Sequence, residues 1–283
     1  MRYWTCAAAA ACLASPAFAQ SAPAGPELPS ADELASRDSF TVGLGGALVP
    51  DYEGSDDYRF IPAGAVRGQY HGISFTTRGL YLYVDVVPQA GSVDFDAGPI
   101  VGVRFNKRRH IKDDVVELLP KTKTATEVGG FAGMSLHGLT NAYDKLSLRL
   151  DVLHDVGDAH RSTTFGPNVE FATPLSTTTY ASANVGAEFV GNKYADYYYT
   201  ITPAESLATG GLLPAYNADG GMKDWKAGVL LNQSVSGNLL HGFSIFGTAQ
   251  YSRLVGDFKR APIVSDRGSA SQWIAAAGAA YTW

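Results

Sequence analysis

The chain has 283 residues, of which 46% are hydrophobic and 17% charged, and its formal net charge is −5. The longest apolar run, Cys6–Ala14, is too short to cross a bilayer as a helix, which excludes a helical membrane protein. An acidic chain without a lysine and arginine cluster is not expected to bind nucleic acid. Abundant glycine and tyrosine instead favour a chain rich in β-strands.

Residues 1–19 are predicted to be a cleaved signal peptide. Arg2 precedes the apolar run Cys6–Leu13, and Ala17–Ala19 has the small residues of a cleavage site. Cleavage before Gln20 would remove both cysteines, so no disulfide or thiol chemistry is expected in the exported chain. Residues 20–39 are rich in proline, alanine and serine and are predicted to form a flexible periplasmic lead.

From residue 40 to residue 283, segments of about ten residues alternate apolar and polar side chains, as half-buried strands do. In 143–154, for example, Leu146, Leu148 and Leu150 alternate with polar or charged neighbours. We place strands at 40–50, 58–70, 72–78, 80–87, 93–106, 126–137, 143–154, 163–173, 177–191, 223–235, 241–254 and 272–283. This pattern predicts an all-β fold of about twelve strands, with ten to fourteen possible.

The number of strands depends on a split near Arg78–Gly79. Bacterial single-chain barrels have an even number of strands, so 72–87 is divided into two strands shorter than usual. With this division the long connections 51–57, 107–125, 155–162, 192–222 and 255–271 all fall on one side. Long loops on one side and short turns on the other predict a transmembrane antiparallel up-and-down β-barrel in the outer membrane.

Charges in the middle of the polar strand faces point to a polar lumen with lipid outside. The candidate lumen-lining residues are Arg59, Arg67, Arg104, Arg149, Asp151, Glu170 and Glu188. Two interpretations stay open: these charges set the selectivity of a pore, or they form ion pairs that fill a narrow barrel.

The C-terminal strand is bracketed by aromatic residues. Trp273, Tyr281 and Trp283 share one face, separated by about the height of the lipid-facing band. They are predicted to lie in the two aromatic girdles at the membrane interfaces. A final amphipathic strand that ends on an aromatic residue also resembles the signal read by the outer-membrane assembly machinery, which is an expected partner together with lipid.

The connection after the first strand carries the sequence Pro50, Asp51, Tyr52, Glu53, Gly54, Ser55, followed by Tyr58. This loop resembles the P-x-Y-x-G-S-x-x-Y segment of the MipA/OmpV family of outer-membrane proteins. The resemblance continues at Gly98–Pro99, Arg108–Arg109, 198–206, Gly220–Gly221, Gly256–Asp257 and 261–264, in family order. It implies an outer-membrane barrel over 40–283 and, for the family's namesake, a scaffold between a lytic transglycosylase and a murein synthase.

No catalytic site, cofactor site or metal site is predicted. The six histidines are scattered, and the nearest pair of catalytic residue types, His160 with Ser162, is placed in a loop. The acidic residues of the first loop are expected to be solvated rather than to bind a cation. The run Tyr197–Tyr199 is interpreted as an interfacial belt or an ordered loop, with a ligand platform as the alternative.

The leading functional hypothesis is therefore a non-catalytic outer-membrane scaffold for peptidoglycan-remodelling enzymes. It follows from the resemblance and from the proline-rich lead. A small-solute channel with a charged lumen and a surface adhesin or antigen that acts through long extracellular loops are the alternatives.

Overall fold

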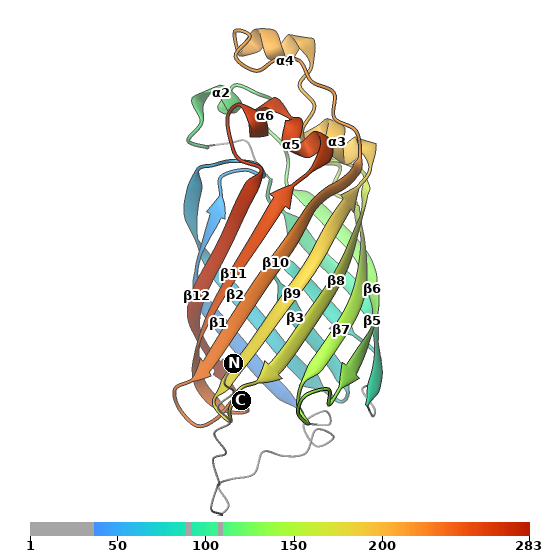
Figure 1. Ribbon diagram of the computed structural model, residues 1–283, viewed down its shortest axis with the longest axis vertical. Helices are drawn as coiled ribbons and strands as arrows, with labels where there is room; N and C mark the ends of the chain where they lie inside the picture. Colours follow the sequence, from blue (N-terminus) through green and yellow to red (C-terminus); the bar gives the residue numbers. More distant parts are fainter. Residues whose placement is uncertain (1–36, 89–91, 107–109) are drawn as a thin grey trace, which may run out of the picture.

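The computed structural model describes residues 37–88, 92–106 and 110–283, and these form a closed antiparallel β-barrel (Figure 1). Consecutive strands are hydrogen-bonded neighbours, and the last strand closes the barrel by pairing with the first. The expected signal peptide and the lead up to residue 36 lie outside the described residues. The predicted all-β barrel of about twelve strands is confirmed.

The twelve strands begin and end within two residues of the predicted bounds. They are β1 (Ser39–Pro50), β2 (Tyr58–Tyr70), β3 (Ile73–Arg78), β4 (Tyr81–Asp85), β5 (Val93–Arg104), β6 (Ala125–His137), β7 (Lys145–Asp155), β8 (Thr163–Pro174), β9 (Thr179–Val190), β10 (Gly221–Ser234), β11 (Gly242–Leu254) and β12 (Ser271–Thr282). The first strand starts at Ser39, so the last residue of the predicted lead belongs to the barrel.

The predicted split of 72–87 is also found. β3 has 6 residues and β4 has 5, whereas β1 has 12 and β10 has 14. Gly79 turns the chain between β3 and β4 with a φ of +59°, a conformation that glycine adopts without steric cost. This hairpin is therefore much shorter than the strands on either side of it.

The alternation of side chains matches a barrel with lipid outside. On β7, Leu148 is 53% exposed, whereas the inward-facing Leu153 is 8% exposed. On β7, Leu148, Leu150 and Val152 are all exposed at alternate positions, and such exposed apolar residues build an apolar outer surface. No helix within the described parts of the chain is long and apolar enough to cross a membrane.

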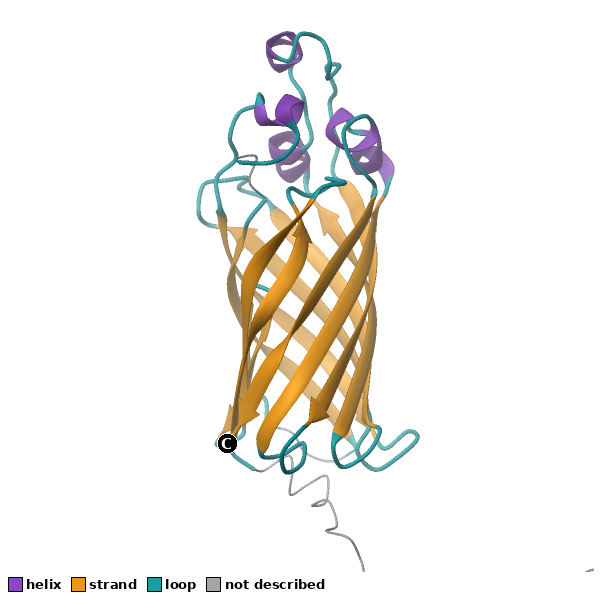
Figure 2. Ribbon diagram, turned by 90° about the vertical axis from the view of Figure 1, so that its left-hand side faces the viewer, coloured by secondary structure: helices purple, strands orange, loops and turns teal. Residues whose placement is uncertain are grey.

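One end of the barrel carries short helices in its connections, and the C-terminus lies at the other end (Figures 1 and 2). The helices are α2 (Asp114–Glu117), α3 (Asn192–Tyr198), α4 (Pro203–Ala208), α5 (Gly256–Arg260) and α6 (Pro262–Ser265). Bacterial barrels have long extracellular loops and short periplasmic turns, so the helical end faces outward.

Candidate functional site

A buried network of charged side chains occupies the extracellular part of the lumen. The Arg104 guanidinium at the end of β5 donates to Glu188 Oε1 on β9 at 2.8 Å and to Glu127 Oε1 on β6 at 3.2 Å. Lys223 Nζ on β10 lies 2.9 Å from Glu188 Oε2, and its side chain is 1% exposed. Strands from different parts of the wall are thus joined by ion pairs across the lumen.

Two loop residues extend this network upward. The Tyr194 hydroxyl on α3 donates to Glu53 Oε2 at 2.8 Å, and Lys223 pairs with the other oxygen of Glu53. Burial alone would raise the pKa of the Glu53 carboxyl, but the charges of Lys223 and Arg104 outweigh it and hold the pKa below its ordinary value. Burial raises the pKa of the Tyr194 phenol well above its ordinary value, so this hydroxyl stays protonated and donates.

A second set of charges lies nearer the periplasmic end. Arg78 on β3 pairs with Glu170 on β8 at 2.7 Å, and Arg149 pairs with Asp151 at 2.7 Å on β7. The Tyr83 hydroxyl donates to Asp151 at 2.9 Å. Because β3 and β8 are far apart in the barrel order, the Arg78–Glu170 pair spans the lumen.

The seven candidate lumen residues differ in their surroundings. Glu188 and Arg104 belong to the upper network; Arg149, Asp151 and Glu170 belong to the lower set. Arg59 lies 3.8 Å from Asp51 and donates to the carbonyl oxygen of Asp51 at 2.8 Å. Arg67 is exposed, and within the described residues it has no ion pair. Among the described residues, all of the seven except Arg67 therefore lie in ion pairs.

The loop 51–57 is hydrogen-bonded to the last extracellular connection, and we call this set of contacts the latch. Tyr52 donates its hydroxyl to the carbonyl oxygens of Ile263 at 2.9 Å and Arg267 at 3.2 Å. Gly54 N–H donates to Gln272 Oε1 at 3.2 Å, and Gly54 O accepts from Ser269 N–H at 2.8 Å. The first extracellular connection is thereby fixed to the last one.

The acidic side chains of this loop do not match the solvated loop that the sequence suggested. Asp51 is 3% exposed and accepts a 3.0 Å hydrogen bond from Lys112 N–H. Glu53 contacts Lys223 and Tyr194. The solvated interpretation is wrong for Asp51 and Glu53, because a buried carboxylate needs partners and these two have them.

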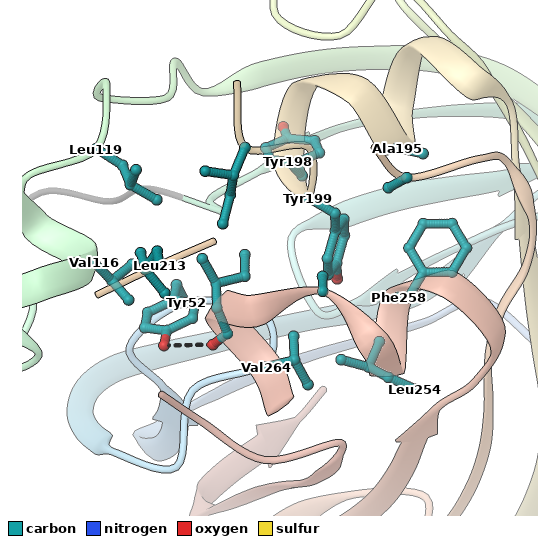
Figure 3. Close-up of a cluster of buried hydrophobic side chains, with 14 of the residues drawn as sticks. Tyr52, Val116, Leu119, Ala195, Tyr198, Tyr199, Leu213, Leu254, Phe258 and Val264 are labelled. Atoms are coloured by element: carbon teal, nitrogen blue, oxygen red, sulfur yellow. Dashed lines mark hydrogen bonds between the residues drawn. The ribbon is translucent and has the colours of Figure 1, made fainter. Parts of the chain in front are cut away.

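Above the network, the extracellular connections pack into one hydrophobic cluster, which we call the cap (Figure 3). Its buried side chains come from every long connection except 156–162: Tyr52, Ile111, Val116, Leu119, Val190, Tyr194, Ala195, Tyr198, Tyr199, Ile201, Leu213, Ala218, Leu254, Phe258, Ala261, Ile263 and Val264. Close packing of this kind holds the extracellular connections together over the mouth of the barrel.

The tyrosine run belongs to the cap. Tyr198 and Tyr199 are 1% and 0% exposed, and the Tyr199 ring packs edge-on against Phe258 at 5.0 Å. Tyr197 accepts a hydrogen bond from Lys123 N–H at 2.8 Å. The run is thus an ordered loop packing on its neighbours, and its buried members cannot form an external ligand platform.

The closest arrangement to a catalytic pair is buried and structural. His160 Nε2 lies 3.0 Å from Glu127 Oε1, and His160 Nδ1 accepts from the backbone N–H of Ser162 at 3.2 Å. The backbone amide thus occupies the nitrogen through which a base would activate a hydroxyl. In the described residues no group of three or more His, Cys, Asp or Glu could hold a metal ion.

The C-terminal aromatic residues lie on the outer surface near both ends of β12. Trp273 is 53% exposed and packs against Tyr251 at 5.1 Å, and Tyr251 packs against Trp225 at 5.4 Å. At the other end, Tyr281 packs against Trp283 at 4.6 Å. The two groups form aromatic bands on either side of the apolar surface.

The sequence pattern missed Glu127, Lys223 and Tyr194. Lys223 and Asp224 both face the lumen because the pairing of β9 with β10 shifts between Met222 and Asp224. Such a bulge breaks the period of two on which the prediction relied. Tyr194 lies in a loop helix whose position depends on contacts distant in sequence. Only Glu127 had a readable signal, since it alternates with apolar residues on β6.

A family model described as MltA-interacting protein MipA matches residues 42–283. The chain belongs to this family. It is an outer-membrane β-barrel, as the resemblance to MipA/OmpV proteins implied. Of the segments that carried that resemblance, Arg108–Arg109 lie outside the described residues.

A comparison with curated proteins finds no match. Solved structures similar to this MipA-family chain include the toluene transporter TbuX of Ralstonia pickettii, with 9% identity, a TM-score of 0.33 and 87% and 88% of the two chains covered. A porin structure is 9% identical, with a TM-score of 0.33 and with 87% of this chain and 99% of the porin covered. OmpT of Vibrio cholerae is 8% identical, with a TM-score of 0.33 and with 86% of this chain and 97% of OmpT covered. Similarities this remote carry no argument about function.

Proposed function

We propose that this MipA-family barrel is a non-catalytic scaffold that holds peptidoglycan-remodelling enzymes at the inner face of the outer membrane. The partners would be a lytic transglycosylase and a murein synthase, as the resemblance implied. The family description, MltA-interacting protein, supports a murein-enzyme partner. A partner in the periplasm can reach only the periplasmic end of the barrel.

The observation that carries the proposal is the surface of the periplasmic end. The outer end is filled by the cap and by the ion network. At the periplasmic end, apolar side chains stand exposed on turns beyond the strands: Leu139 is 51%, Leu175 63% and Val235 60% exposed. Exposed apolar side chains on consecutive turns are typical of a protein-binding surface, and those at this end are the ones that a periplasmic partner can reach.

The test is capture of the lytic transglycosylase by crosslinking in intact cells. The variant carries Leu139→Asp, Leu175→Asp and Val235→Asp together. Each lost apolar contact is worth about 1.5 kcal/mol or more, so capture should fall more than about tenfold. The matched control carries Leu207→Asp and Leu212→Asp, which change exposed leucines at the outer end. Equal capture by both variants and the unaltered chain would contradict the scaffold.

A small-solute channel is the second candidate, supported by the exposed, unpaired Arg67 side chain on the inward face of β2. Single-channel recording in planar bilayers tests it. A conductance whose anion preference falls in Arg67→Gln would support a channel. If neither the unaltered chain nor a Gly54→Ala variant with a loosened cap conducts ions, the channel hypothesis is excluded.

A further inference from the structure

The barrel wall has an open sheet edge on β2. This strand pairs with β1 along its whole length, from Tyr58 to Gln69, but pairs with β3 only from Arg67 to Tyr70. The hairpin of β3 and β4 turns back at Gly79, below the outer rim. In the described residues, the part of β2 from Tyr58 to Ala65 therefore has no strand beside it on that side.

The backbone groups that face the opening follow from the alternation of an antiparallel strand. Val66 N–H donates to Thr77 Oγ1 at 2.9 Å, and Val66 O accepts from the same hydroxyl at 3.3 Å, so Val66 points toward β3. Every second residue outward from it points the same way. These are Gly64, Pro62 and Phe60, and none of them has a hydrogen-bond partner on this side among the described residues.

The open edge begins at the outer membrane interface and runs toward the middle of the bilayer. Trp273 N–H donates to the Tyr58 hydroxyl at 3.1 Å, so β2 begins at the level of the outer aromatic band. A tilted strand descends about 2.6 Å per residue, which puts Gly64 about 15 Å lower. At this depth two N–H and three C=O groups cannot be left against hydrocarbon chains.

The nearby side chains leave this edge uncovered. The Phe60 side chain folds away from it, because its ring lies over Gly46 on β1, where an added Cβ would sit 2.0 Å from the ring. Phe60 is 73% exposed, and Gly64 is also exposed. At the top of the opening, Lys112 Nζ donates to Tyr58 O at 2.9 Å, with its side chain 60% exposed and 3.7 Å from Asp57.

A strand from another protein, or from a second copy of this chain, fits the edge poorly. Pro62 has no N–H to donate, and proline on an edge strand is a device that prevents pairing. A plain hydrocarbon chain cannot satisfy the polar groups. The occupant must present several hydroxyls, carry chains that pack on apolar surface, and reside in the outer leaflet.

We propose that the open edge of β2 binds a phosphorylated glycolipid of the outer leaflet. Sugar hydroxyls would bond the backbone groups of Phe60 and Pro62, which lie nearer the outer interface, and the polar groups that join the sugars to the acyl chains would bond those of Gly64. A phosphate would contact the Lys112 ammonium. The acyl chains would continue along the lipid-facing surface next to Phe60 and Leu48, which is 49% exposed. This site is independent of the proposed scaffold, which uses the opposite end of the barrel.

The test is native mass spectrometry of the purified full chain with diphosphorylated lipid A. Gly64→Phe places a ring on the outer face beside the opening, where it would obstruct a bound lipid, and the wall tolerates it because an added Cβ at Gly64 meets no atom closer than 3.8 Å. The matched control is Gly247→Phe on the fully paired β11, where a Cβ meets nothing within 4 Å. Lipid A binding should weaken at least about tenfold in Gly64→Phe and stay unchanged in Gly247→Phe.

Two further arms identify the ligand chemistry. Phosphatidylglycerol should bind much more weakly than lipid A, and Lys112→Gln should abolish the preference for phosphorylated over dephosphorylated lipid A. Retention of lipid A by Gly64→Phe, equal binding of phosphatidylglycerol, or no lipid A on the unaltered chain would each overturn the proposal. Heat-modified migration on gels establishes that each variant forms the barrel.

Discussion

The hydroxyl of Tyr52 donates a 2.9 Å hydrogen bond to the carbonyl oxygen of Ile263, and this contact joins the first extracellular connection to the last. These two residues are 211 positions apart in the chain, yet they lie side by side because β12 pairs with β1. Closure of the barrel therefore also closes its outer mouth. Two of the segments that carry the family resemblance, the first loop and 261–264, therefore meet in the cap.

Tyr52→Phe should loosen the cap and leave the barrel intact. The change removes one hydroxyl that serves two carbonyl oxygens, one of them buried, at a cost of about 1 kcal/mol or somewhat more. Hydrogen exchange in 262–267 should become several-fold faster, with no change in β7. Tyr70→Phe, at the exposed periplasmic end of β2, is the control. Unchanged exchange in 262–267 would show that the hydroxyl does not hold the loop.

Lys223→Met should destabilise the whole barrel. The ammonium is buried between Glu53, Glu188 and Asp224, and its loss leaves buried carboxylates without their main partner. Breaking a buried pair in this way costs about 3–5 kcal/mol. Chemical denaturation in detergent micelles measures it, with Lys121→Met at an exposed loop position as the control. A loss no larger than that of the control would mean that the network is not structural.

The strands could be predicted from sequence because lipid outside and charges inside impose a strict period of two. The alternation on β7 placed Leu148 and Arg149 on opposite faces, and the requirement for an even strand number separated β3 from β4. The partners of these charges were not predictable, because a pair such as Arg104 with Glu188 depends on the radius and stagger of the closed barrel.

The cap was not predictable for a different reason. Its helices are short, from 4 to 7 residues, and no hydrophobic period of that length can be read from a sequence. They are stabilised by contacts such as Tyr199 with Phe258, which come from separate connections. Acidic residues such as Glu53 suggested solvent exposure because Lys223, which neutralises Glu53, is 170 positions away.

Acid should release the cap through Glu53. The pKa of this carboxyl is held below its ordinary value, so its contribution to stability is complete above about pH 4.3 and is lost as the pH falls below that value. Proteolysis of the α3 segment should accelerate over this acidic range. Glu53→Gln should remove most of the pH dependence. Glu205→Gln, which alters the N-terminal capping box of helix α4, should keep the pH dependence. The same pH profile in Glu53→Gln would assign the effect to another group.

Gly54→Ala should disrupt the latch by two separate effects. Gly54 has a φ of +104°, which costs a residue with a side chain about 1–3 kcal/mol. An added Cβ would also lie 2.5 Å from Val264 Cγ2 in the cap. The control is Gly210→Ala, where φ is +66° but no atom lies within 4 Å of the added Cβ. On heating, the amides of 262–267 should lose more of their protection against hydrogen exchange in Gly54→Ala than in Gly210→Ala. Equal protection at 262–267 in the two variants would mean that Gly54 does not hold the first loop against the last connection.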